Sequence, residues 1–144
     1  MNETENQKLR SKIMKSVGRT HTRPEIKVRQ LLHRMGFRFR LHQKLLPGSP
    51  DIVLPKYRTA IFVHGCFWHR HPDCKYATTP KTRKEYWIPK LSANVERDAR
   101  KSAQLEALGW RVIVIWECET RNLISLESRI RKDFIPPSDS DKTL

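Results

Sequence analysis

The chain has 144 residues, about the length of one domain, and its 38% of hydrophobic residues suffices for one compact core. Lys and Arg number 29 against 15 Asp and Glu, and four Trp with five Phe argue against intrinsic disorder. The longest apolar runs, residues 60–63 and 112–116, are far shorter than the roughly 18 residues that cross a membrane. Three cysteines, an odd number, favour reduced thiols or metal ligands over a disulfide framework. Because the first residues also lack an apolar signal segment, we expect a soluble, cytoplasmic single domain with no membrane partner.

The positive charge is concentrated near the N-terminus, where residues 1–44 hold 12 Lys and Arg against 3 Asp and Glu. A polyphosphate is the natural complement of such a surface, because each neutralised phosphate releases condensed counterions. A solvated basic surface and an acidic membrane are the alternatives, but no basic amphipathic helix with a large apolar face is evident. The charge therefore favours a nucleic-acid partner.

Residues 1–20 are rich in basic side chains and poor in core formers, so they predict a basic arm that orders on its partner. Lys12 and Arg19 of this arm are candidate DNA contacts. Residues 21–135 are predicted to form the folded domain, and residues 136–144 a polar tail.

The first helix of the folded domain is predicted to begin after Thr22. Thr22 and Glu25 have the spacing of a capping box, and Pro24 occupies a position where its missing N–H is not needed. Gly36 is the expected stop signal. The predicted core stripe of this helix consists of Ile26, Leu31, Leu32 and Met35.

The remaining pattern predicts an α/β fold. Residues 37–41 alternate as a half-buried strand, and residues 51–54 and 59–63 read as strands on either side of a turn. Residues 64–89 form a long irregular segment of the functional kind, and residues 111–116 a buried strand. Helices are predicted near Ser92, ending at Gly109, and over residues 123–134. The inward side chains of the helix near Ser92 are expected to be Leu91, Val95, Ala99, Leu105 and Leu108. A long crossover predicts that strands 59–63 and 111–116 are parallel neighbours in a mixed sheet.

Four residues could hold a metal ion. Cys66, His71 and Cys74 have metal-ligand spacing, and Cys118 follows the last strand. If the two strands are parallel neighbours, their carboxyl ends coincide and Cys118 lies beside Cys66. Three thiolates and one imidazole form the closed shell of a structural zinc site. The alternative is three unrelated buried cysteines.

Asp51, His64 and His69 are the candidate catalytic residues. A carboxylate at the start of a strand can hold a hard divalent cation, although a turn aspartate satisfied by water is the simpler interpretation of Asp51 alone. Two imidazoles near such a site suit attack of water on a phosphodiester, because one can help deprotonate water and the other can steady charge. Each histidine could equally be structural or solvated.

Three aromatic residues, Phe67, Trp68 and Trp87, lie in or near the same metal-rich segment. They could pack beneath the loop, which is the usual place for aromatic rings. They could also be wedges that enter between base pairs and kink the duplex. The sequence leaves both interpretations open.

Four segments carry motifs that occur together in one enzyme family. They read Pro47-Gly48-Ser49-Pro50-Asp51, Phe62-Val63-His64-Gly65-Cys66-Phe67-Trp68-His69, Asn94-Val95-Glu96-Arg97-Asp98, and Gly109-Trp110-Arg111-Val112 followed by Trp116-Glu117-Cys118. Over residues 10–131 the chain resembles the very short patch repair (Vsr) DNA mismatch endonucleases. The resemblance implies a restriction-endonuclease-like (PD-(D/E)XK-type) fold, with a mixed β-sheet flanked by helices and a structural zinc site.

The resemblance also implies an activity. Family members are expected to use Mg²⁺ to nick one strand 5′ of the thymine in a T·G mismatch, which arises when 5-methylcytosine deaminates. A cytosine-5 methyltransferase is the implied functional partner, and repair proteins complete a short patch. We expect a nucleoid-associated monomer of bacterial cytoplasm. The alternatives are a restriction-type endonuclease on matched DNA, a non-enzymatic zinc DNA-binding protein and an RNA nuclease.

Carried over to this chain, the resemblance implies roles for particular residues. Asp51 and the backbone carbonyl of Val63 would hold Mg²⁺, while His69 would activate water and His64 would support the phosphate. Glu25 matches an acidic position near the active site, although its capping role explains it equally well.

Three binding groups follow from the same resemblance. The structural zinc set would be Cys66, His71, Cys74 and Cys118. The wedge on the major-groove side would be Phe67, Trp68 and Trp87, and the N-terminal arm would lie against the minor groove.

Two features depart from the wider pattern. Phe62-Val63-His64 stands where the superfamily has an acidic residue two before a lysine, which agrees with the mismatch-nicking family. The spacing from His71 to Cys74 is one residue longer than in the best-known member, so Asp73 is a competing zinc ligand.

Overall fold

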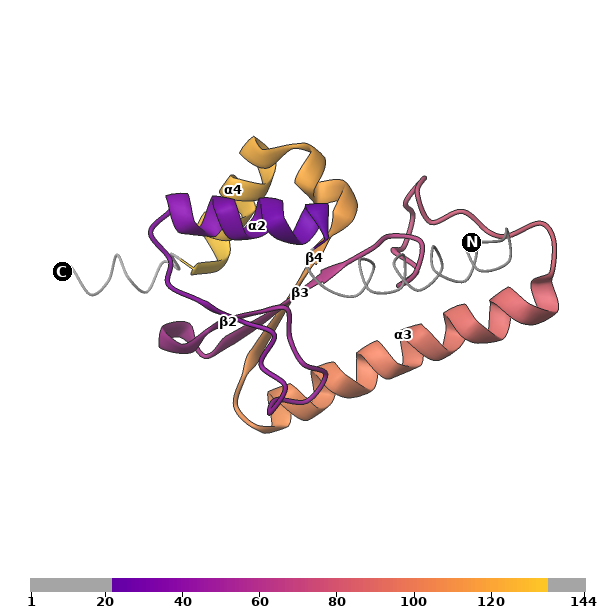
Figure 1. Ribbon diagram of the computed structural model, residues 1–144, viewed down its shortest axis with the longest axis horizontal. Coiled ribbons are helices and arrows are strands. Elements are labelled where there is room, and N and C mark those ends of the chain that lie inside the picture. Colours follow the sequence, from indigo (N-terminus) through magenta and orange to yellow (C-terminus); the bar gives the residue numbers. More distant parts are fainter. Residues whose placement is uncertain (1–21, 135–144) are drawn as a thin grey trace, which may run out of the picture.

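The computed structural model describes residues 22–134. The predicted arm, with Lys12 and Arg19, and the predicted tail lie outside the described residues. The described chain forms a four-stranded mixed sheet in the order β1-β2-β3-β4, with helices on both faces (Figure 1). The predicted α/β class is therefore confirmed.

The strands and helices follow one another along the chain. The strands are β1 (Arg40–Leu41), β2 (Ile52–Leu54), β3 (Thr59–His64) and β4 (Arg111–Trp116). The α-helices are α2 (Arg23–Arg34), α3 (Lys84–Ala107) and α4 (Leu123–Phe134), and the short 3₁₀ helices are η1 (Pro55–Tyr57) and η2 (Glu117–Arg121). No helix within residues 22–134 is both long and apolar enough to span a bilayer.

Strand pairing brings the ends of β3 and β4 together. β2 pairs antiparallel with β1 and with β3, whereas β3 and β4 are parallel, in register from Thr59↔Arg111 to His64↔Trp116. The predicted parallel pairing of these two strands is confirmed. Since β2 runs opposite to β3, the start of β2 lies at the same edge of the sheet as the carboxyl ends of β3 and β4.

Each face of the sheet has its own apolar cluster. Helices α2 and α4 cover one face, and α3 covers the other (Figure 1). Alternate residues of β3 serve the two sides: Ile61 packs toward α2 and α4, while Ala60 and Phe62 join Leu105 of α3. The main cluster lies between the sheet and the helix pair, so the larger core does not depend on α3.

Helix α2 begins and ends where the sequence predicts. Thr22 accepts a hydrogen bond from the Glu25 N–H, and Gly36 closes the helix at a φ of 89°. The predicted core stripe is partly wrong, because Ile26 is 38% exposed. Val28, which was not predicted, is buried instead. Ile26 lies at the margin of the stripe rather than within it.

The strand over residues 37–41 is shorter than predicted. Burial alternates along the whole run, but only Arg40 and Leu41 pair with β2. Phe37 instead contacts the rings of Tyr57 and Phe134 edge to face, at centroid distances of 5.5 and 5.2 Å. Side-chain packing, rather than strand pairing, therefore holds the start of this run.

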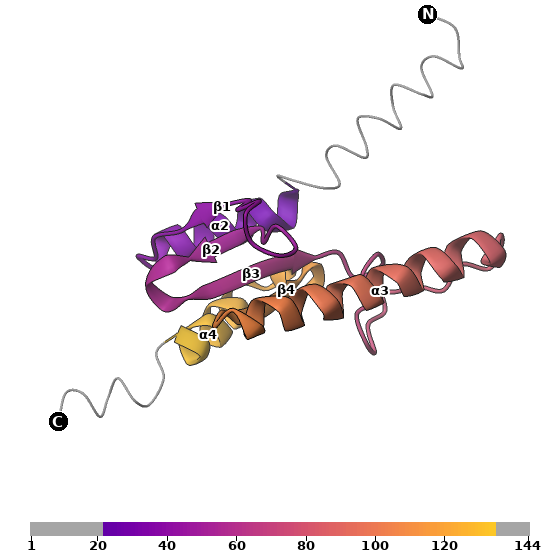
Figure 2. The same cartoon turned by 90° about the horizontal axis from the view of Figure 1, so that it is seen from below.

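Helix α3 begins at Lys84, earlier than the predicted start near Ser92, and includes Pro89. The irregular segment is accordingly shorter than expected. Of the five predicted inward residues, only Leu91 and Leu105 are buried, while Val95, Ala99 and Leu108 are exposed. The first half of α3 extends past the sheet (Figure 2), so its apolar side chains have no sheet to pack against.

Candidate active site and metal centre

Asp51 lies at the sheet edge where β3 and β4 end. It precedes β2, and its Oδ2 accepts a hydrogen bond from the Val63 N–H at 2.7 Å. The structure thus brings together the two residues predicted to hold Mg²⁺. Burial raises the pKa of Asp51 to about 6, and the negative charge of Glu25 adds to the rise, while the Val63 N–H opposes it. A poorly solvated carboxylate of this kind is one that a bound cation would stabilise.

Glu25 faces the same site. Its backbone N–H is capped by Thr22, but its buried side chain contacts His42 Nε2 at 2.6 Å and pairs with Arg29. Donor atoms of Glu25, His42 and Asp51 lie within 4.8 Å of one another. Glu25 therefore lies at the site as well as at the helix cap. His42 was missed, because nothing in the local pattern marks a histidine that leaves β1 in a left-handed conformation (φ 45°).

His64 and His69 stack on each other at this edge. Their ring centroids are 3.8 Å apart, and the planes differ by 5°. Burial, with help from His69, lowers the pKa of His64 to about 4. His64 is consequently a neutral imidazole near pH 7, able to accept or donate a hydrogen bond without adding charge.

Asp98 of α3 orients His69. His69 Nδ1 lies 2.5 Å from Asp98 Oδ2, an arrangement that fixes the ring and turns Nε2 away from the carboxylate. A carboxylate in this position holds the imidazole in one tautomer and one orientation. No role was predicted for Asp98, although it ends the 94–98 segment. Asp98 meets His69 because α3 packs beside the loop, and the sequence does not indicate that packing.

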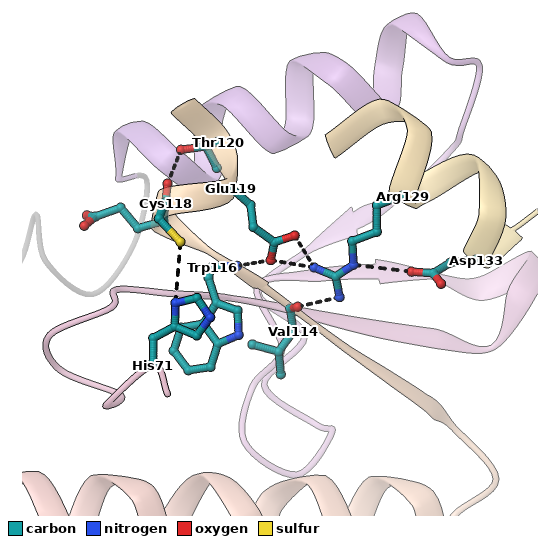
Figure 3. A network of polar contacts seen from close by, with 9 residues as sticks. His71, Val114, Trp116, Cys118, Glu119, Thr120, Arg129 and Asp133 are labelled. Atoms are coloured by element: carbon teal, nitrogen blue, oxygen red, sulfur yellow. Dashed lines mark hydrogen bonds and ion pairs between the residues drawn. The ribbon is translucent and has the colours of Figure 1, made fainter. Parts of the chain in front are cut away.

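The four predicted zinc ligands gather beyond the ends of β3 and β4. Donor atoms of Cys66, His71, Cys74 and Cys118 lie within 4.8 Å of one another, and Cys118 Sγ is 3.4 Å from His71 Nδ1 (Figure 3). Three sulfurs and one imidazole nitrogen are the donor set that zinc prefers in a closed tetrahedral site. Burial raises the pKa of the Cys66 thiol to about 12, because the thiolate is poorly solvated there, and a bound cation would stabilise that thiolate. The exposed Asp73 is not among the clustered donors of the described residues.

A polar network holds η2, which carries Cys118, against the end of β4. Glu119 accepts a hydrogen bond from the Trp116 N–H at 3.0 Å and two from Arg129 at 2.5 and 2.6 Å (Figure 3). Arg129 of α4 also donates to the Val114 carbonyl at 2.9 Å. The imidazole of His71 stacks on Trp116 at 4.2 Å. Both segments that carry candidate metal ligands are therefore fixed to β4.

The three predicted wedge residues form an aromatic cluster. Phe67 lies 5.2 Å from Trp68 and 5.8 Å from Trp87, and the two indoles are 5.8 Å apart. None belongs to either buried cluster, and Trp68 is 45% exposed. Lys90 places its ammonium over both indoles. The rings pack on one another at the surface rather than in the core.

Comparison with known proteins agrees with this geometry. The family model described as DNA mismatch endonuclease Vsr matches residues 3–76. The type II nicking enzyme V.XorIIP of Xanthomonas oryzae pv. oryzae is 54% identical over 86% of this chain and 90% of its own length. The DNA mismatch endonuclease Vsr of Escherichia coli K12 is 46% identical over 78% of this chain and 71% of its own.

A solved structure supports the fold class. The catalytic domain of the homing endonuclease I-Bth0305I superimposes with a TM-score of 0.55 at 24% identity, covering 80% of this chain and 96% of that domain. At that identity the likeness concerns the fold alone, and it agrees with the predicted restriction-endonuclease-like architecture. Because the family model matches residues 3–76 and both relatives align over most of the chain, the chain belongs to the Vsr family of DNA mismatch endonucleases.

Proposed function

We propose that this endonuclease nicks one strand of duplex DNA 5′ of the thymine in a T·G mismatch, in a reaction that depends on Mg²⁺. One observation carries the proposal: Asp51, the stacked histidines and the surface aromatic cluster gather around one sheet edge. This arrangement supports cation binding by the Asp51 carboxylate, proton transfer by a histidine and probing of base stacking by the exposed rings.

The oxygen donors at Asp51 fit a hard cation. The carboxylate and the Val63 carbonyl would hold Mg²⁺, which prefers oxygen ligands and keeps part of its water shell. When bound, Mg²⁺ would polarise the phosphoryl oxygen and stabilise the leaving 3′ oxygen. The four-residue thiol and imidazole set fits Zn²⁺ instead, and its contribution is structural.

The chain's own side chains supply the proton transfer. His69, oriented by Asp98 through Nδ1, would take a proton from water at Nε2. His64, neutral because of its burial, would hydrogen-bond the phosphate without repelling the cation. Burial of His64 at the end of β3 and its stacking on His69 restrict the motion of both rings before substrate binds.

The aromatic cluster accounts for mismatch selectivity. Phe67, Trp68 and Trp87 would enter from the major-groove side, and the arm containing Lys12 and Arg19 would follow the minor groove. A T·G step costs less to unstack than a correctly paired step, so part of the selectivity comes from deformation of the DNA. The proposal includes a cytosine-5 methyltransferase as functional partner, downstream repair proteins, a monomeric state and a place on the bacterial nucleoid.

Trp68→Ala should lose mismatch discrimination more than overall affinity. The exposed indole contributes stacking energy worth about 1–3 kcal/mol per base, whereas phosphate contacts supply most of the binding. We expect the ratio of nicking rates on T·G and matched duplexes to fall by roughly tenfold or more, with duplex affinity changed much less. The matched control is Tyr76→Ala, which removes a ring elsewhere on the zinc loop, the segment 66–79 that contains Cys66, His71 and Cys74. A discrimination ratio equal to that of the wild type would assign Trp68 to packing.

The activity itself is tested by end-labelling each strand of duplexes that differ only in T·G against C·G, in Mg²⁺ or EDTA. We expect one Mg²⁺-dependent cut, on the thymine strand and 5′ of the mismatched base. Cleavage of both strands of the matched duplex would identify a restriction-type enzyme. The absence of any product under all conditions would identify a DNA-binding protein without nuclease activity.

A further inference from the structure

Arg70 occupies the position between His69 and the zinc-cluster residue His71, and the proposed function gives it no part. Its backbone is left-handed, with a φ of 55°, which turns its side chain back over its own loop. The guanidinium then donates to three carbonyls: Phe67 at 3.4 Å, Ala77 at 3.3 Å and Thr78 at 2.9 Å. It also lies 3.5 Å from Thr79 Oγ1. One half-buried side chain thus joins both ends of the segment 67–79.

The same segment contains two of the zinc-cluster residues. His71 and Cys74 lie between the carbonyls that Arg70 connects, and Ala77 donates its N–H to the Cys74 carbonyl at 3.1 Å. The cluster donors fix the inner side of the loop, where Cys66 and Cys118 lie. The guanidinium fixes the outer side, where the chain passes from Phe67 to Thr79. A planar fork of five donors suits several fixed carbonyls, and a lysine ammonium cannot reproduce that geometry.

Arg70 also contacts the aromatic cluster directly. Its guanidinium carbon is 5.7 Å from the centroid of the Phe67 ring, in addition to its bond to the Phe67 carbonyl. Phe67 in turn lies within 5.8 Å of both Trp68 and Trp87. Arg70 therefore holds both the backbone and the ring of Phe67, the residue that connects the aromatic cluster to the zinc loop.

We propose that Arg70 is a positioning residue for the aromatic cluster: it fixes the angle at which Phe67 and Trp68 leave the zinc loop, and thereby sets discrimination between mismatched and paired DNA. The inference rests on the proposed function, in which these rings enter the mismatched step. A competing role is a plain phosphate contact, in which the positive charge matters and the fork does not.

The test compares Arg70→Lys, which keeps the charge, with Arg70→Met, which removes it. Arg121→Lys and Arg121→Met are matched controls, because Arg121 lies against the same loop over Tyr76, at 4.4 Å from the ring. Each full-length protein is assayed for zinc content and for nicking of T·G and matched duplexes. The fluorescence of 2-aminopurine beside the thymine reports unstacking, and the salt dependence of binding counts phosphate contacts.

We expect both Arg70 variants to keep one zinc per chain and the wild-type salt slope. In both variants the ratio of nicking rates on T·G and matched duplexes should fall about tenfold, and most of the 2-aminopurine signal should be lost. The reason is that several charge-assisted hydrogen bonds of Arg70 orient Phe67 and Trp68. A duplex whose step is already opened by an abasic site opposite the thymine should restore their nicking rate, while the Arg121 variants should match the wild type throughout.

Three results would overturn the inference. A wild-type ratio for Arg70→Lys, together with a salt slope reduced by about one for Arg70→Met, would assign a phosphate contact. Loss of zinc from both Arg70 variants would assign a role in holding the zinc loop only. Failure of the abasic duplex to restore nicking would place the defect in chemistry. The proposed function has its own test, because a wild-type enzyme that does not prefer T·G would refute it whatever the Arg70 variants do.

Discussion

Asp51→Asn should reduce Mg²⁺-dependent nicking by about a thousandfold or more, while binding of a T·G duplex stays within a few-fold of the wild type. The substitution keeps an oxygen that can accept the Val63 N–H, so the local geometry survives. It removes the negative charge that holds the cation, and cation stabilisation of a transferring phosphoryl group is worth several kcal/mol. Single-turnover nicking and a parallel binding titration measure the two effects separately.

The same variant should be at least as stable as the wild type at neutral pH. Burial raises the pKa of Asp51 from 3.8 to about 6, so at pH 7 the folded state bears an ionised carboxylate in a poorly solvated place. The stability that this raised pKa provides is present below about pH 4 and is lost as the pH rises through 6. The advantage of Asp51→Asn in urea unfolding should therefore grow as the pH rises from about 4 to about 6, stay constant above that, and vanish on acidification.

Two outcomes would contradict this assignment. Wild-type nicking by Asp51→Asn in Mg²⁺ would remove the carboxylate from the reaction. A variant that loses nicking together with stability would show a folding defect instead. Asp73→Asn is the matched control, because that aspartate is exposed on the zinc loop and should leave nicking unchanged.

Cys118→Ser should abolish zinc binding, destabilise the protein by roughly 4 kcal/mol or more, and reduce nicking at least a hundredfold. Cys118 is the one cluster donor that comes from the end of β4, so its loss separates the loop from the sheet. His69, Phe67 and Trp68 lie on that loop, and all three lose their support. Zinc analysis, thermal unfolding and single-turnover nicking measure the three losses.

The main core should survive this substitution. The larger apolar cluster consists of side chains from α2, α4 and the sheet, and it contains none of the zinc-cluster residues. Far-ultraviolet circular dichroism should therefore retain most of its helical signal at low temperature. Asp73→Ala, which changes an exposed side chain of the same loop, should keep its zinc. A Cys118→Ser protein with full zinc and full activity would refute the role assigned to this residue.

The sequence predicted the parts of the fold that local patterns determine. A run of β-forming residues marked β4 to the residue, and Thr22 with Gly36 marked both ends of α2. The long crossover predicted the parallel pairing of β3 and β4, and that pairing brought Cys118 to Cys66 across 51 intervening residues.

The errors arose where tertiary packing decides. The stripe of α3 gave no sign that the first half of the helix extends beyond the sheet, so Val95 was expected to be buried. The irregular segment was expected to reach residue 89, but the helix begins at Lys84 and accommodates Pro89. Asp98 and His42 acquire their neighbours only when α3 and the β1–β2 connection are placed around Asp51 and His69, and no spacing along the chain encodes those distances.

The central claim is that two parallel strand ends build a zinc-held loop that supports the histidines beside Asp51. X-ray absorption at the zinc edge of the purified, active full-length protein tests it most directly. We predict one zinc per chain with three sulfur neighbours at about 2.3 Å and one nitrogen at about 2.0–2.1 Å. Active protein without zinc, or a zinc surrounded only by nitrogen and oxygen, would contradict the account.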